Sequence, residues 1–171
     1  MFLAAIIFSF LCFLIDLFFL AGLGLEVKIS VSLLLVIIFL LTHRDREAMI
    51  SAMLTGLLID LTAPLFPFGV MLGWHFVVYI LARQLLASFF GINKMSAIAI
   101  FSLLIGALYY AGYYLILFLL DYLPGRSAEF NLWAAAGKTG LSAVAFSLIV
   151  LASLAFGARL KRLFARWFLI R

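Results

Sequence analysis

Residues 95–120, MSAIAIFSLLIGALYYAGYYLILFLL, contain no Asp, Glu, Lys or Arg. The segment lies between Lys94 and Asp121, and its apolar residues are continuous rather than alternating with polar ones. A transmembrane helix needs about 20 mostly apolar residues in a row, whereas a strand of a membrane β-barrel alternates apolar and polar positions. Residues 95–120 are therefore predicted to form a membrane-spanning α-helix.

The composition of the whole chain supports the same class of protein. Of the 171 residues, 68% are hydrophobic and 11% are charged, and the mean hydropathy is +1.32. A soluble domain of this composition would expose apolar patches larger than the few hundred Å² that soluble proteins tolerate. We therefore expect one all-α, polytopic transmembrane domain, with helices over about residues 2–25, 29–42, 48–61, 70–90, 95–120 and 132–156. Two of these segments, 29–42 and 48–61, are short for a full span, so five spanning helices are the alternative to six.

The distribution of Lys and Arg predicts how these helices are oriented. With both termini in the cytoplasm, Lys28, Arg126 and Lys138 fall outside, and the other nine of the 12 Lys and Arg residues fall inside. Because the positive charges gather at helix ends, the net charge of +5 does not indicate nucleic-acid binding. Residues 157–171 form a basic tail with interspersed Leu and aromatic residues, which is typical of an amphipathic helix on an anionic cytoplasmic membrane face.

The sequence carries no pattern typical of a catalytic, cofactor or metal site. Cys12 is the single cysteine, which excludes an intramolecular disulfide and a cysteine-based metal cluster. Gly137-Lys138-Thr139 is not the end of a phosphate-binding loop, because Leu132 stands where that loop requires glycine. We therefore expect a protein that is not an enzyme and that holds no cofactor or metal.

A few polar residues lie within the apolar segments, where each of them needs a partner. Asp16 is expected to pair with His75 or Arg83 from another helix, or to take up a proton and hydrogen-bond in its neutral form. His75 and Tyr79 are four residues apart on one helix face, and Arg83 extends that face. These residues are candidate intramembrane polar contacts.

Two further patterns indicate contacts between helices. The segment 95–120 carries a cluster of tyrosines that would either pack against neighbouring helices or line a pocket for a flat ligand: Tyr109, Tyr110, Tyr113 and Tyr114. The segment 132–156 carries small residues four apart, a spacing that lets two helices approach closely: Ala135, Thr139, Ala143 and Ser147. The sequence leaves open whether this stripe packs inside the fold or against a partner protein.

Residues 56–69, GLLIDLTAPLFPFG, followed by an apolar run to Tyr79, resemble the bacterial rod shape-determining MreD family. That family is similar in having a helix that ends in Gly-x-x-x-Asp-Leu, a short turn, Pro-Leu-Gly, and a helix with a tyrosine near its cytoplasmic end. The matching residues are Gly56, Asp60, Pro67, Gly69 and Tyr79. Phe68 replaces the family's leucine, and Thr62-Ala63-Pro64 stands where the family has glycines.

The resemblance implies a non-enzymatic scaffold of the cell-elongation machinery in the inner membrane. Proteins of this family couple peptidoglycan synthesis to the MreB cytoskeleton, and their partners are MreC, RodA and a class B penicillin-binding protein. A negative charge at a helix C-terminus is not stabilised by the helix dipole, so Asp60 should bond to loop N–H groups or to a partner. Pro67 and Gly69 should set the turn that begins the next helix. The turn would then present an outer surface to MreC.

A small-molecule-binding membrane subunit of an energy-coupling-factor transporter is the alternative. Such subunits are compact six-helix bundles of similar length, and the MreD fold is similar to theirs. In that case Trp74, His75 and the tyrosines of residues 95–120 would line the pocket. The pattern from Asp60 to Gly69 favours the MreD family.

Overall fold

A computed structural model describes residues 2–20, 30–62, 67–89, 95–121 and 132–168, and these residues are helices and short turns. Helix α1 (Phe2–Leu14) continues into a π-helix, η1 (Ile15–Leu20). The other helices are α2 (Val31–Leu41), α3 (Asp45–Thr62), α4 (Val70–Phe89), α5 (Met95–Asp121) and α6 (Leu132–Phe168). The all-α class is thus confirmed for the described residues. The expected helices over residues 29–42, 48–61, 70–90 and 95–120 lie within about three residues of these bounds.

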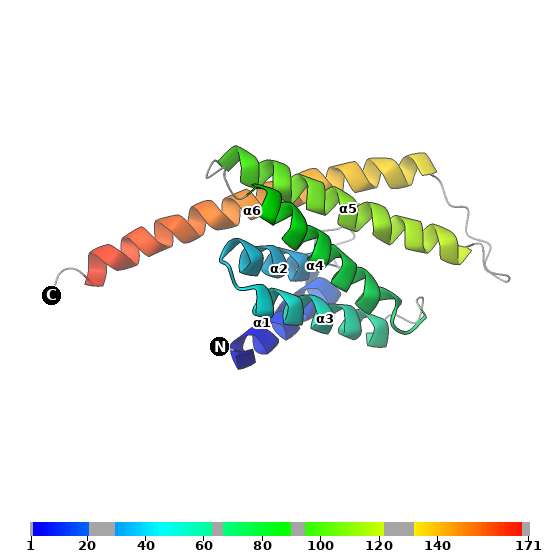
Figure 1. Cartoon of the computed structure of the whole chain (residues 1–171), viewed down its shortest axis with the longest axis horizontal. Helices are drawn as coiled ribbons and strands as arrows, with labels where there is room; N and C mark the ends of the chain where they lie inside the picture. The colour runs from blue at the N-terminus through cyan, green and yellow to red at the C-terminus, as the bar shows by residue number, and fades with distance from the viewer. Residues whose placement is uncertain (1, 21–29, 63–66, 90–94, 122–131, 169–171) are drawn as a thin grey trace.

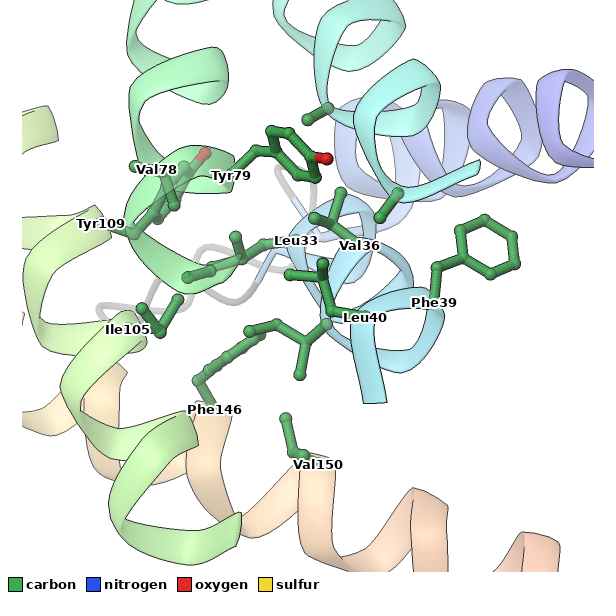
Figure 2. Close-up of a cluster of buried hydrophobic side chains, with 14 of the residues drawn as sticks. Leu33, Val36, Phe39, Leu40, Val78, Tyr79, Ile105, Tyr109, Phe146 and Val150 are labelled. Carbon is green, nitrogen blue, oxygen red and sulfur yellow. The ribbon is translucent and has the colours of Figure 1, made fainter. Parts of the chain in front are cut away.

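The helices form two groups that share one core (Figure 1). Helices α5 and α6 pack mainly on each other, and α3 packs mainly on α4 and α2. Between the groups, Phe101 and Ile105 of α5 and Phe146 and Val150 of α6 are buried together with Leu33 and the rest of the cluster in Figure 2. This shared core fixes where α5 lies against α4, and so positions the polar residues described below.

Within the described residues, three helices are by length and composition apolar enough to cross a membrane: Val70–Ser88, Ser96–Leu120 and Trp133–Gly157. Helix α2 has 11 residues, and at 1.5 Å per residue it is about 16 Å long, well short of a hydrocarbon core of about 30 Å. It packs against α1, α3, α4 and α6, and Leu33, Val36, Ile37 and Leu40 are almost fully buried. Its apolar composition therefore reflects burial inside the protein, and hydropathy alone does not distinguish this from contact with lipid.

Helix α6 differs most from its expected bounds. The sequence predicts a helix over residues 132–156 followed by a separate tail, whereas α6 continues without interruption to Phe168. Residues 169–171 of the expected tail lie outside the described residues, as do residues 21–25 of the first expected helix. The span within α6 still ends at Gly157, where the apolar sequence gives way to basic residues.

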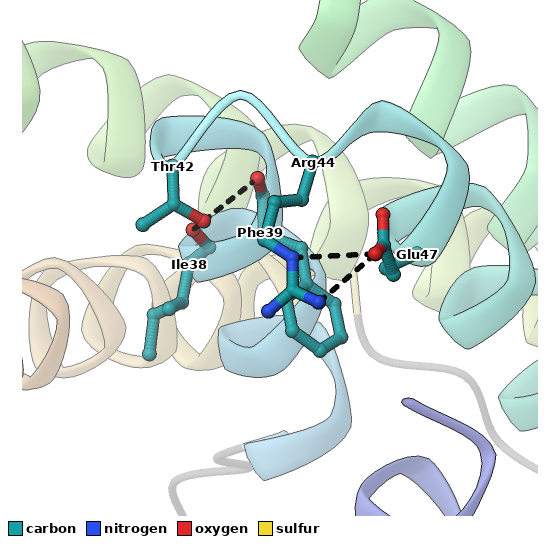
Figure 3. A network of polar contacts seen from close by, with 5 residues as sticks. All are labelled: Ile38, Phe39, Thr42, Arg44 and Glu47. Carbon is teal, nitrogen blue, oxygen red and sulfur yellow. Dashed lines mark hydrogen bonds and ion pairs between the residues drawn. The ribbon is translucent and has the colours of Figure 1, made fainter. Parts of the chain in front are cut away.

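The turn between α2 and α3 is held by local polar contacts (Figure 3). The Thr42 hydroxyl donates to the carbonyl oxygens of Ile38 and Phe39, at 2.8 and 3.1 Å. The Arg44 guanidinium donates to Glu47 Oε1 at 2.9 and 3.3 Å and lies over the Phe39 ring, 5.3 Å from its centroid. The bonds from Arg44 lower the pKa of the Glu47 carboxyl. These contacts keep the charged turn close to the end of α2.

His43 occupies a left-handed position in this turn, with φ of 58°. The His43 N–H donates to Leu40 O at 3.0 Å and the Arg44 N–H donates to Phe39 O at 2.8 Å. This is the Schellman pattern of helix C-termini, in which glycine usually takes the left-handed position. A side chain with a Cβ is strained there, because the Cβ crowds the following carbonyl oxygen.

Replacing His43 with glycine is therefore expected to stabilise the protein by about 1 kcal/mol. Unfolding in detergent micelles, followed by circular dichroism, would measure the change. Ala152→Gly is the matched control, since Ala152 is exposed within α6 and glycine should destabilise a helix interior by about 1 kcal/mol. Equal losses in both variants would contradict the strain at His43.

Candidate functional site

The carboxylate of Asp60 caps the N-terminus of α4. Its Oδ2 accepts from the N–H groups of Gly69 and Leu72 at 3.0 and 2.9 Å, and its Oδ1 accepts from the Met71 N–H at 2.9 Å. Gly69 has φ of +95°, which only glycine adopts readily, and this conformation turns its N–H toward Asp60. Asp60 lies in the last turn of α3, but its charge lies at the positive end of the α4 dipole. Of the two roles predicted for Asp60, the structure shows the bond to loop N–H groups.

The other residues of the MreD-like motif also lie along the contact between α3 and α4. Gly56 faces the α4 backbone so closely that a Cβ would lie 2.6 Å from Leu72 Cα. Pro67 is exposed, and its carbonyl accepts from the Val70 N–H at 3.2 Å as α4 begins. At the other end of the hairpin, the Tyr79 hydroxyl donates to Asp45 O at 3.3 Å. The motif residues therefore hold two helices together over most of their length.

Asp16 caps the N-terminus of α2 in the same manner. Its Oδ1 accepts from the Val31 N–H at 2.7 Å, and its Oδ2 accepts from the Ser32 N–H at 3.0 Å. The Ser30 hydroxyl donates to the same Oδ2 at 3.4 Å and accepts from the Leu33 N–H at 3.2 Å. Because α2 is too short to reach across a bilayer, its first N–H groups need such a partner within the protein.

The prediction that Asp16 pairs with His75 or Arg83 is thus wrong. Arg83 pairs with Asp45 instead, with Nε 3.0 Å from Oδ2, and both side chains are substantially exposed. His75 bonds to residues of α4 and α5, as described below. The π-helix that contains Asp16 lies at the end of α1 beside the start of α2, and the backbone there offers N–H donors that the sequence pattern does not reveal.

The two caps make the first four helices a pair of similar hairpins. In each hairpin, an aspartate near the end of the first helix accepts from two successive N–H groups at the start of the second, Val31 and Ser32 or Met71 and Leu72. The donors follow the aspartate by 15 and 16 residues in the first hairpin and by 11 and 12 residues in the second. Each carboxylate occupies a helix N-terminus that would otherwise attract an anionic ligand.

His75 and Tyr109 join α4 to α5 in the buried interior. His75 Nδ1 lies 2.8 Å from Met71 O, and Nε2 lies 3.2 Å from the Tyr109 hydroxyl. A carbonyl oxygen only accepts, so Nδ1 carries the proton, and neutral Nε2 accepts from Tyr109. The rings meet edge to face with centroids 5.3 Å apart. Both ring nitrogens of His75 therefore have partners within the protein.

Tyr110 connects the same region to the Asp16 cap. Its hydroxyl accepts from the Ser30 N–H at 3.1 Å, and its ring meets the Tyr109 ring edge to face at 5.2 Å. Polar and aromatic contacts thus run from Asp60 through Met71, His75 and the two tyrosines to Asp16. Of the four tyrosines in the cluster, Tyr113 and Tyr114 pack on each other, with centroids 5.7 Å apart.

The small-residue stripe of α6 packs inside the fold, against α5. Ala135, Ala143 and Ser147 are buried, and Thr139 is half-buried with its hydroxyl on the Ala135 carbonyl at 2.8 Å. Ala143 lies against Gly106, where a Cβ on the glycine would be 3.3 Å from Ala143 Cα. The Ser147 hydroxyl donates to Ala99 O at 3.1 Å and bonds to the Ser102 hydroxyl at 3.0 Å. The stripe therefore packs inside the fold, on α5, rather than against a partner protein.

The described residues include no group of three or more His, Cys, Asp or Glu side chains able to hold a metal ion. The polar groups that the sequence singles out mainly serve to fix helices to one another, through two helix caps and one buried network. Trp74 differs from them. Its indole packs on Gly112 of α5, and its buried Nε1–H has no hydrogen-bond partner among the described residues.

No protein-family model, curated protein or solved structure matches this chain.

Proposed function

We propose that this chain is a non-enzymatic inner-membrane scaffold of the cell-elongation machinery, of the MreD type, and that it couples peptidoglycan synthesis to the cytoskeleton through partner proteins. The proposed topology has six membrane-embedded helices and both termini in the cytoplasm. In it, α2 does not span the bilayer by itself but lies buried inside the protein on the part of the chain that returns from the outer to the cytoplasmic side. MreC, RodA and a class B penicillin-binding protein are the expected partners.

One observation carries the proposal. The residues that resemble the MreD motif converge on a single structural element, the α3–α4 hairpin, where Asp60 bonds to Gly69 and Leu72 and so fixes the start of α4 against α3. Beside this capped helix start, two large apolar side chains are exposed: Leu61 at 65% and Phe68 at 71%. Exposed apolar groups held at the outer end of a capped hairpin suit the binding of a partner protein. Asp60 would then act on the partner indirectly, by holding the start of α4 in place.

The test is co-purification of MreC with the tagged chain from bacterial membranes in mild detergent. Replacing both Leu61 and Phe68 with alanine is expected to reduce the recovered MreC at least tenfold, since buried aromatic anchors contribute about 2 kcal/mol or more to an interface. Phe18→Ala is the matched control, because Phe18 is 73% exposed on η1, and η1 packs mainly on α1 and α2 rather than on the α3–α4 hairpin.

The outcomes separate the assignment from the surface. MreC that remains bound to the double variant would refute the role of Leu61 and Phe68. A wild-type chain that recovers none of the three expected partners would refute the MreD assignment itself.

The transporter alternative has one observation in its favour. The buried Trp74 Nε1–H lacks a partner and lies between α4 and α5, close to where a pocket with Tyr109 was expected. Against it, His75 and Tyr109 bond to each other rather than facing an open space. Recovery of a pair of ATPase subunits or of a bound vitamin in the same purification would favour the transporter subunit.

A further inference from the structure

Helix α6 is longer than a membrane requires. Its 37 residues extend about 55 Å at 1.5 Å per residue, against a hydrocarbon core of about 30 Å. The apolar span within it covers Trp133–Gly157, so residues 158–168 continue for about 16 Å beyond the span. Figure 1 shows this end of α6, in orange and red, running clear of the other helices. We refer to residues 158–168 as the C-terminal arm.

Gly157 lies where the span meets the arm, and no packing contact explains it. A Cβ added there would meet nothing within 4 Å, whereas a Cβ on Gly56 or Gly106 would meet a neighbouring helix. Glycine weakens a helix by about 1 kcal/mol relative to alanine. A glycine in open space at the membrane boundary is thus a place where α6 can bend at low cost.

The sequence of the arm suits a charged membrane surface. In the helical register of α6, apolar residues recur at the spacings of one helix face: Leu160, Leu163, Phe164, Trp167 and Phe168. Basic residues fill most of the remaining positions: Arg159, Lys161, Arg162 and Arg166. The arm contains no Asp or Glu, so its charged side chains are all positive.

We propose that α6 bends at Gly157 and that the arm lies along the adjacent membrane leaflet, with its apolar residues in the interface and its basic residues on anionic lipid headgroups. Charge complementarity selects the headgroup phosphates as the ligand, and the arm begins at the bilayer surface where they are concentrated. Each basic residue near such a surface adds a factor of about five to binding. The proposal goes beyond the scaffold role and does not depend on it.

The test uses the full chain in lipid nanodiscs, so that both leaflets have one composition and orientation does not matter. One set contains neutral phosphatidylcholine, and the other also contains anionic phosphatidylglycerol. Brominated lipids quench tryptophan at the interface, and the difference between the wild type and Trp167→Phe isolates the signal of Trp167. We expect strong quenching of Trp167 in anionic nanodiscs and weak quenching in neutral ones.

Two variants test the charge and the bend. Replacing Arg159, Lys161, Arg162 and Arg166 with glutamine should reduce the quenching in anionic nanodiscs to the neutral level. Gly157→Ala should lower the binding constant of the arm for the anionic surface about fivefold, and so move half-maximal quenching to a higher fraction of anionic lipid. Gly140→Ala, which also fills open space on α6, should leave this midpoint unchanged.

Other results would overturn the proposal. Equal quenching in the two lipids would mean that the apolar residues of the arm insert independently of the headgroup charge. No quenching in either would mean that the arm stands off the membrane. A midpoint that Gly157→Ala and Gly140→Ala leave equally unchanged would remove Gly157 as the hinge.

Discussion

Asp60→Ala is expected to destabilise the protein by about 4 kcal/mol. The carboxylate accepts from three backbone N–H groups at 2.9–3.0 Å, and the residue is only 8% exposed. A hydrogen bond to a charged group contributes about 1.5–3 kcal/mol, and a buried N–H left without an acceptor adds its desolvation cost. Because the three bonds share one carboxylate, their losses should not add fully.

Unfolding by sodium dodecyl sulfate in mixed micelles, followed by circular dichroism, would measure this loss. Asp60→Asn keeps the shape and one acceptor oxygen, so it should lose only about 2 kcal/mol. Asp45→Ala removes a carboxylate that is 47% exposed and paired with an exposed arginine, and it should cost less than about 1 kcal/mol. If Asp60→Ala were as mild as Asp45→Ala, the cap would not be what holds the start of α4.

The two aspartate caps show which hydrogen-bond partners could be predicted from the sequence and which could not. For Asp60, the unfavourable position at the end of its own helix pointed to the bond with nearby N–H groups, and the donors follow after one short turn. For Asp16, the donors follow a longer segment that carries no motif. The sequence instead suggested a pair with His75 or Arg83, or a protonated carboxyl that hydrogen-bonds in its neutral form. The difference is physical, since a carboxylate inside an apolar helix is satisfied equally well by a side chain or by a helix N-terminus.

The burial of α2 shows a second limit of the sequence. A helix that is apolar on all sides is either embedded in lipid or surrounded by other helices. Leu33, Ile37 and Leu40 have the same hydropathy in either setting, and only their contacts with α1, α3, α4 and α6 show which one applies. The α6 stripe is similar, because its spacing predicted close packing but its partner, Gly106 on α5, became evident only from the fold.

Gly56→Ala is the second change with a large expected effect, because it adds one methyl group where two helix backbones touch. The new Cβ would lie 2.6 Å from Leu72 Cα and 2.8 Å from Met71 O, and neither is a flexible side chain that could turn away. Helices α3 and α4 would have to separate, and overpacking of this kind typically costs about 1–3 kcal/mol. We expect a loss near 3 kcal/mol, measured by the same detergent titration.

Gly73→Ala provides the control on α4, close to the same contact. A Cβ there meets nothing within 4 Å, so alanine should be neutral or should stabilise the helix by up to about 1 kcal/mol. The backbone atoms that crowd Gly56 belong to Met71 and Leu72, the residues whose N–H groups bond to Asp60. Separating the helices should therefore also lengthen those bonds, and the Gly56→Ala/Asp60→Ala double variant should lose at least 1 kcal/mol less than the sum of the single losses. Strict additivity would instead mean that the close approach and the cap stabilise the hairpin independently.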